Sequence, residues 1–303
     1  MDNPATVART MWTFFEPIHA VTYFAPEARE AFEAAGLRGF WRGYFAGRAA
    51  PLGAIDTAPV VASFFTFAPG MVARAVPDVW SRAAPERALA ARTAGAVTAL
   101  RRLLDNPTGG PTGGPDGGAG AGAGLGSVAE AADLLERATD GLDCAGRVLG
   151  AANAALPRPD EPLARLWQAT TLLREHRGDG HVAALVAAGV TGCEAVVWRS
   201  AIDIPRARMQ PSRGWTDEQW QAAADRLGDL GWLDADGAPT PAGRTRYAQV
   251  ETATDLAAAA PWRRLGTDGV ARLATVIRPF AVACAASLPY PNPIGLPGPA
   301  ATG

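Results

Sequence analysis

Two parts of this 303-residue chain repeat the same short motifs in the same order, which limits the folds that the chain can adopt. Residues 34–39 (AAGLRG) recur as residues 187–192 (AAGVTG). Four further pairs keep this order: Trp12 and His19 with Trp167 and His176, residues 78–81 with 213–216, residues 136–140 with 251–255, and residues 147–150 with 263–266. Because ordered repeats indicate duplication of one unit, we expect two related modules, residues 1–150 and 151–303.

Apolar residues recur three and four positions apart over much of the chain, which is typical of amphipathic helices. The clearest predicted helices span residues 129–148, 162–176 and 217–230. Gly178 and Gly180 separate His176 from His181, so we do not expect these two histidines to form a pair on one helix. Strand signals are short and weak, and the predicted fold is mainly α, with two pseudo-symmetric modules.

A glycine-rich run, DNPTGGPTGGPDGGAGAGAGLG, occupies residues 105–126. Glycine at this density has few side chains to bury, so the run predicts a flexible loop. In the second module the aligned residues 233–239 read LDADGAP, in which Asp236 and Gly237 favour a tight turn. We therefore interpret the first run as the enlarged tip of a hairpin. The tail from Pro289 onwards is expected to be irregular.

Residues 215–250 resemble the second half of a winged helix-turn-helix domain of the MarR type. In that pattern a helix ends in Leu-x-x-x-Gly-x-Leu, a hairpin wing follows, and Thr-x-x-Gly-Arg opens the next helix. The matching segments are residues 227–233, the turn at Asp236 and Gly237, and residues 240–244. The whole chain also resembles an actinobacterial family of helix-turn-helix proteins, on residues 16–19 (EPIH), 213–215 (RGW) and 260–262 (APW).

This resemblance implies two winged-helix-like modules with short β-hairpin wings, and a transcriptional regulator that binds DNA. One chain would then mimic a two-fold dimer, as a pseudo-dimeric monomer or within a homodimer. On the candidate recognition helices, DNA phosphates would be contacted by Arg82, Arg87 and Arg92 in the first module and by Arg226 in the second.

The charges near the two candidate recognition helices do not favour DNA binding equally. The second candidate recognition helix, residues 215–227, carries Asp217, Glu218 and Asp225 against Arg226 alone. Each carboxylate near a phosphate costs about 1 kcal/mol at ~4 Å, even in bulk water. The formal net charge of −2 also excludes a globally basic footprint for nucleic acid. We therefore expect one half of the molecule to bind DNA poorly.

The first module is rich in aromatic residues, which suit a pocket for a flat organic ligand. We predict that an aromatic or hydrophobic small molecule binds between the modules. The predicted contacts are Tyr23, Phe24, Trp41, Tyr44 and Phe64, with Arg199 available for a carboxylate or phosphate group. The alternative is that these aromatic residues only fill the core.

The three histidines of the chain, His19, His176 and His181, support a different interpretation. A pseudo-two-fold axis would place His19 and His176 in one central cavity, with His181 nearby. Imidazole nitrogens are common ligands of zinc, iron and haem. The chain would then be an enzyme, or a protein that binds haem or a transition metal. The plainer alternative places His19 in the core and the other two in a loop, and both remain open.

Cellular location is predicted from what the sequence does not contain. Cys144, Cys193 and Cys284 lie far apart, which favours a reducing compartment over a disulfide framework. The N-terminal segment has no apolar stretch typical of a signal peptide. No run of about 18 apolar residues is free of charges and helix breakers. We expect a soluble, cytoplasmic protein with no membrane partner.

Overall fold

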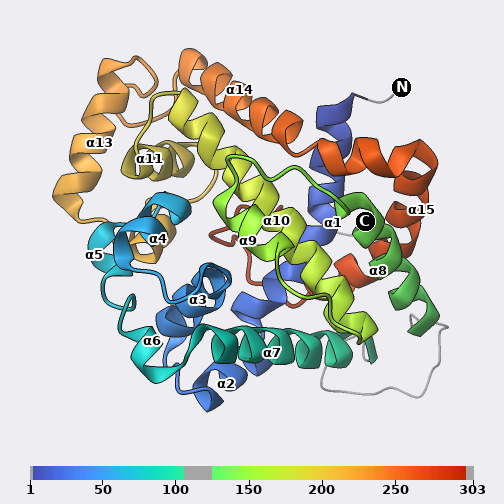
Figure 1. Ribbon diagram of the computed structural model, residues 1–303. Coiled ribbons are helices and arrows are strands. Elements are labelled where there is room, and N and C mark those ends of the chain that lie inside the picture. Colours follow the sequence, from blue (N-terminus) through green and yellow to red (C-terminus); the bar gives the residue numbers. More distant parts are fainter. Residues whose placement is uncertain (1–2, 106–124, 298–303) are drawn as a thin grey trace, which may run out of the picture.

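The computed structural model describes residues 3–105 and 125–297, and helices dominate both ranges (Figure 1). Before residue 106 the helices are α1 (Pro4–Phe24), α2 (Pro26–Ala34), α3 (Phe40–Ala49), η1 (Ala50–Leu52), α4 (Thr57–Phe64), α5 (Pro69–Val72), α6 (Val79–Arg82) and α7 (Pro85–Asp105). After residue 124 they are α8 (Leu125–Thr139), α9 (Val148–Ala154), α10 (Pro162–Ala187), α11 (Gly192–Ile202), α12 (Arg206–Arg213), α13 (Asp217–Asp229), α14 (Pro241–Ala257) and α15 (Ala260–Ala285). No strand occurs in these two ranges, so the prediction of a mainly α fold is confirmed.

Helix α10 runs through the centre of the molecule and packs against α1, α7, α8, α9 and α14 (Figure 1). The largest hydrophobic core combines side chains of α1, α7, α8, α10 and α15, with Trp167 of α10 fully buried. This core draws on residues 1–150 and residues 151–303 together. The structure therefore does not support two separate pseudo-symmetric modules, because the largest hydrophobic core is shared by the two halves.

Helix α10 also passes through Gly178 and Gly180 without a break and reaches Ala187. The prediction that these glycines keep His176 and His181 off a common helix was wrong. Close packing explains Gly180: a Cβ atom there would lie 2.7 Å from Nη1 of Arg147 and 3.1 Å from Cβ of Ala257. The missing side chain allows Arg147 and Ala257 to pack closely against α10, and this packing outweighs the low helix propensity of glycine.

Helices α11 to α14 enclose a smaller core of their own around Trp198 and Leu227. Within it, α12 and α13 are joined by a turn of three residues, Gly214 to Thr216, which is the connection typical of a helix-turn-helix motif. Gly214 adopts the left-handed conformation (φ 76°), and Thr216 caps α13 reciprocally with Gln219. Figure 1 shows α13 at the edge of the molecule.

The predicted wing of this half is a tight turn and not a two-stranded hairpin. Leu233 and Pro239 form one isolated antiparallel bridge. The Asp234 carboxylate accepts hydrogen bonds from the N–H groups of Asp236 and Ala238, and this local bonding competes with a β-ladder. Helix α14 then begins as predicted, capped by Thr240. The other predicted wing, residues 105–126, lies outside the described residues apart from its ends.

The chain after α15 is irregular as far as it is described, as predicted for the tail. We call residues 288–297 the C-terminal strap. Asn292 within it is buried, and its side chain donates to and accepts from the backbone of Leu296. Leu288 and Leu296 pack against Ala20 of α1, so apolar contacts hold the strap on the helical body.

In the described part of the chain, no helix is by itself both long enough and apolar enough to span a bilayer. Helices α10 and α11 meet the length and composition requirement only together, as a pair bent by 99°.

The contact between the turn and the start of α14 generates a stability prediction. A Cβ atom on Gly243 would lie 2.1 Å from the carbonyl oxygen of Trp232. Gly243→Ala should therefore lower the free energy of unfolding by about 1–3 kcal/mol, measured by urea denaturation. Gly228→Ala on α13 is the matched control, because no atom would lie within 4 Å of its Cβ. Equal urea midpoints for the two variants would contradict the packing described.

Candidate functional site

A cavity of about 650 Å³ lies between α1, α3, α4, α10, α11, α12 and α14. We call it the central cavity. Its volume falls within the range of about 300–1,000 Å³ typical of small-molecule sites. Both halves of the chain contribute to its lining, and Pro293, Ile294 and Gly295 of the C-terminal strap form part of its wall.

One side of the central cavity is aromatic. Tyr44 of α3 and Phe64, Phe65 and Phe67, from the end of α4 and the residues after it, line this side, and we call these four residues the aromatic wall. Phe65 adopts a positive φ of 55°, a sparsely populated conformation for a residue with a side chain. Its carbonyl oxygen would lie 2.0 Å from a Cβ atom on Gly192, so glycine at the start of α11 permits this approach.

A group of charged side chains around Glu175 of α10 adjoins the aromatic wall, because Arg48 lies over the ring of Phe64 and donates to the hydroxyl of Tyr44. Both carboxylate oxygens of Glu175 accept hydrogen bonds from Arg48, at 3.0 and 2.9 Å, and Oε2 also accepts from Arg174 at 2.6 Å. Burial alone would raise the pKa of Glu175, but Arg174 and Arg48 together hold that pKa well below its ordinary range. Glu175 is therefore a buried carboxylate that stays ionised.

Six arginines and five carboxylates line the central cavity. Five of the arginines have carboxylate partners within 4 Å: Arg48 and Arg174 share Glu175, Arg9 pairs with Glu251 and Asp255, Arg177 with Asp255, and Arg199 with Asp203. Arg213 is the exception among the described residues. It donates to the carbonyl oxygen of Pro293 at 2.8 Å and to Ser212, which are all neutral acceptors.

The predicted ligand residues divide between the cavity and the core. Tyr44, Phe64 and Arg199 line the central cavity. Tyr23 donates or accepts at Nε2 of His19, Phe24 packs on Tyr23, and Trp41 packs among Phe45 and Phe67, so these three lie elsewhere.

Sequence reasoning missed the cavity residues Arg48, Arg174 and Arg213 as ligand contacts. Arg213 does lie in the RGW segment of the repeat, and Arg48 stands among small apolar residues. The position of Arg48 within an apolar stretch is the sequence signal that indicates a buried guanidinium.

The three histidines have separate surroundings. His19 is bonded through Nδ1 to Thr171 and through Nε2 to Tyr23, at 2.9 and 2.8 Å, so neither nitrogen is free. His181 is bonded to Thr254 at 2.9 Å. Thr171 and His181 are ten residues apart on α10, which is about 15 Å along a helix axis.

The predicted site of His19, His176 and His181 is thus not assembled. In the described residues no group of three or more His, Cys, Asp or Glu side chains is arranged to hold a metal ion. The geometry does not favour the interpretation as a haem or metal protein, since the ring nitrogens of His19 already have protein partners.

A family model described as the helix-turn-helix family matches residues 8–291. The chain belongs to the helix-turn-helix family. This membership suggests DNA binding, because such proteins place the second helix of the motif in the major groove. The match does not bear on the MarR type or on an actinobacterial origin. No curated protein and no solved structure matches the chain.

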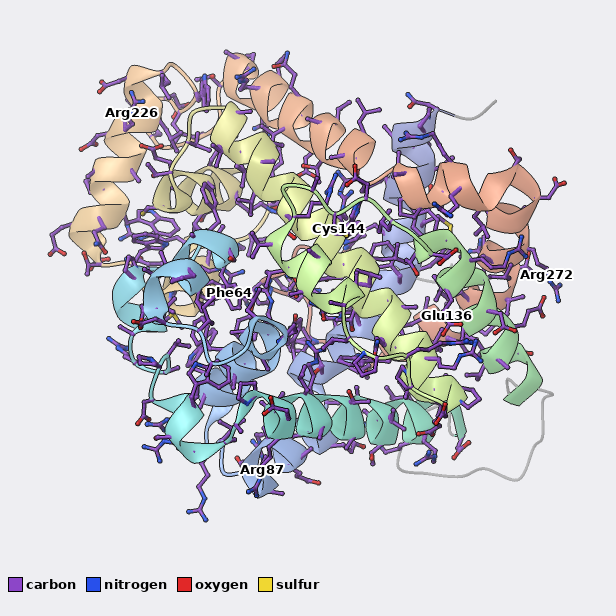
Figure 2. All side chains as sticks on the ribbon, in the orientation of Figure 1. Phe64, Arg87, Glu136, Cys144, Arg226 and Arg272 are labelled. Carbon is purple, nitrogen blue, oxygen red and sulfur yellow. The ribbon has the colours of Figure 1, made fainter. Side chains whose placement is uncertain are left out.

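One of the four predicted DNA contacts, Arg226, lies at the surface of α13. The Arg226 side chain is 53% exposed and lies 3.7 Å from Glu194. In Figure 2, Arg226 lies at the upper left and Arg87 at the lower edge. Arg82 is exposed and paired with Asp78 at 2.8 Å.

The prediction that Arg92 contacts DNA was wrong. It is 5% exposed and donates to the carbonyl oxygen of Gly47 and to Asn153, and its guanidinium lies over the ring of Trp167. A buried guanidinium cannot reach a DNA phosphate. Arg92 instead ties α7 to α3, α9 and α10 within the molecule.

The ion pairs around Glu175 generate a stability prediction. Glu175→Gln removes the negative charge and leaves Arg48 and Arg174 inside the protein without their partner. Loss of one member of such a buried pair typically costs about 3–5 kcal/mol in the free energy of unfolding. Urea denaturation at pH 7 measures this loss. Glu130→Gln is the control, since the Glu130–Arg272 pair is exposed and its loss should barely move the midpoint.

The histidines generate a prediction on pH. Burial lowers the pKa of His176 and of His181 to about 4. In the unfolded chain these groups take up protons near pH 6.5, so stability is lost as the pH falls from about 6.5 towards 4. Burial raises the pKa of Asp179 to about 6, which opposes this trend between about pH 4 and 6.

His176→Gln should therefore reduce the loss of unfolding free energy between pH 7.5 and pH 5, and Asp179→Asn should increase it. Urea denaturation of both variants and of the unchanged protein at the two pH values measures these differences. An unchanged pH dependence in both variants would contradict the assignment of protonation states.

Proposed function

We propose that this protein is a DNA-binding transcriptional regulator in which an aromatic or hydrophobic small molecule occupies the central cavity and alters DNA affinity. One observation carries the proposal. Helix α12, the first helix of the α12–α13 motif, contributes Met209 and Arg213 to the cavity lining, and the turn to α13 follows Arg213 directly. The ligand site and the DNA-reading motif thus share an element.

The hydrogen bonds around the turn support coupling between the cavity and α13. The N–H of Ala68 donates to the carbonyl oxygen of Arg213 at 2.9 Å. The indole N–H of Trp215 donates to the carbonyl oxygen of Thr66 at 2.9 Å. Thr66 lies between Phe65 and Phe67 of the aromatic wall. A ligand that displaces this wall therefore acts on the turn, and a ligand that favours one placement of α13 changes DNA affinity by that difference.

The division into two related modules, residues 1–150 and 151–303, belongs to this proposal. Helices α1 and α10 carry the matching Trp and His residues of the repeat, and they pack against each other. The central cavity lies beside this pair and takes side chains from both halves. A single chain would then supply both sides of a ligand site that two identical subunits would otherwise form.

The surface charge of the motif predicts how DNA binding responds to substitution. Residues 206–246 carry six arginines and six carboxylates, so the segment is electrically neutral overall. Affinity then depends on few phosphate contacts and is weakened by each exposed acid on α13.

DNA fragments selected from a random pool by the full-length protein would provide the test. Arg226→Ala should lower affinity for the selected DNA about fivefold or more, and Asp225→Asn should raise it by a similar factor, because each changes about 1 kcal/mol of interaction with phosphate. Fluorescence anisotropy at two salt concentrations measures both. If no sequence is enriched, or if neither substitution changes the affinity, the proposed function is wrong.

A further inference from the structure

Arg213 has an arrangement that differs from every other arginine of the central cavity. Its guanidinium lies 4.8 Å from the ring centroid of Phe67, its Nε is enclosed without a hydrogen-bond partner, and its other donors meet only neutral oxygens. The remaining five lining arginines each lie within 4 Å of a carboxylate. Arg213 therefore carries the positive charge that the cavity lining leaves without a counter-charge.

An enclosed guanidinium with free donor capacity is the group that proteins use to bind planar anions. Arginine presents a rigid fork of N–H donors that fits a carboxylate through two parallel hydrogen bonds. Burial lowers the pKa of Arg213 to about 10, so the group still carries its charge near neutral pH. A bound anion would take the place of the carbonyl oxygen of Pro293 as the hydrogen-bond acceptor of Arg213, and it is the stronger acceptor because it is charged.

The surroundings of Arg213 favour a ligand that is apolar apart from this anionic group. Phe64, Phe67, Leu149, Val182 and Met209 line the same cavity. Arg213 is a single positive charge with no carboxylate among its hydrogen-bond partners, and this matches one negative charge on the ligand. A phosphate dianion would need a second unpaired cation, and the other arginines of the lining are already paired.

We propose that the ligand of the central cavity is a small apolar or aromatic monocarboxylate, with its carboxylate bound by Arg213 and its apolar part against the aromatic wall. The proposal rests on the proposed function for its role in regulation. It does not depend on DNA for its test, because binding of the acid is measured on the free protein. The carbonyl group of Pro293 must yield its hydrogen bond, so the C-terminal strap shifts when the acid binds.

Isothermal titration calorimetry of the full chain with phenylbutyrate and with its uncharged amide is the primary experiment. The amide has nearly the same size and shape but lacks the charge. Phenylbutyrate should bind about 10- to 100-fold more tightly than the amide, the range expected for hydrogen bonds between charged groups. Acetate and inorganic phosphate should bind much more weakly than phenylbutyrate, because they lack the apolar part. Equal affinities for acid and amide, or for phosphate and phenylbutyrate, would overturn the proposal.

Two arginines of α12 provide a matched pair of variants. Arg213→Gln should abolish the preference for the acid, whereas Arg208→Gln should retain it, since Arg208 is exposed and does not line the cavity. Circular dichroism checks that both variants fold. Should Arg213→Gln fail to fold, the comparison of acid and amide on the unchanged protein still decides.

A substitution that fills the cavity gives an independent measurement. Val182→Trp adds bulk to the lining on α10 and should weaken binding of acid and amide alike. Acid binding that is unaffected by Val182→Trp would place the site elsewhere and overturn the proposal.

The two proposals fail in different ways. If phenylbutyrate binds through Arg213 but leaves DNA affinity unchanged, the ligand class stands and the regulatory role is wrong. If DNA is bound but no carboxylate is, the ligand class is wrong and DNA binding stands.

Discussion

The hydrogen-bonded ion pairs between Glu175 and its two arginines are the interaction on which the centre of the molecule depends. They join α10 to α3 within the interior, where Arg48 also lies 4.0 Å over the ring of Phe64. A buried carboxylate with two guanidinium partners is stable only while all three groups keep their hydrogen bonds. Arg48, Arg174 and Glu175 all line the central cavity, so the same ion pairs form part of its wall.

The sequence predicted those parts of the fold that local rules determine. The apolar period located the helix at residues 217–230, and the Thr-x-x-Gly-Arg pattern located the start of α14. The sequence-based prediction failed where packing between distant parts of the chain determines the structure. Gly180 lies within α10, and the close approach of Arg147 and Ala257 leaves no room there for a side chain; no local sequence pattern indicates that approach. The repeat, likewise, predicts two similar halves, but it does not report that their main core is shared.

The site was harder to predict than the fold, because the role of a polar side chain depends on which hydrogen-bond or ion-pair partners it meets in the folded chain. Residue type made three histidines candidate metal ligands in the alternative interpretation, but Thr171 and Tyr23 occupy both nitrogens of His19 in the folded chain. The chain has no lysine and many arginines, so the sequence alone does not distinguish Arg213 from the other arginines. What distinguishes Arg213 is the lack of a carboxylate beside it, and this property exists only after distant helices have met.

The position of Arg213 explains how a small ligand could act on a whole motif. Its carbonyl oxygen accepts from Ala68 beside the aromatic wall, and its side chain donates to Pro293 of the C-terminal strap. Trp215, two residues later, packs against two separate hydrophobic cores, one under the aromatic wall and one within α11 to α14. An anion at this guanidinium withdraws the hydrogen bond from the strap while the backbone bond to Ala68 remains. The strap is then the element free to move, and α12 stays attached to the wall that the ligand contacts, so ligand binding is expected to release the strap before it displaces α13.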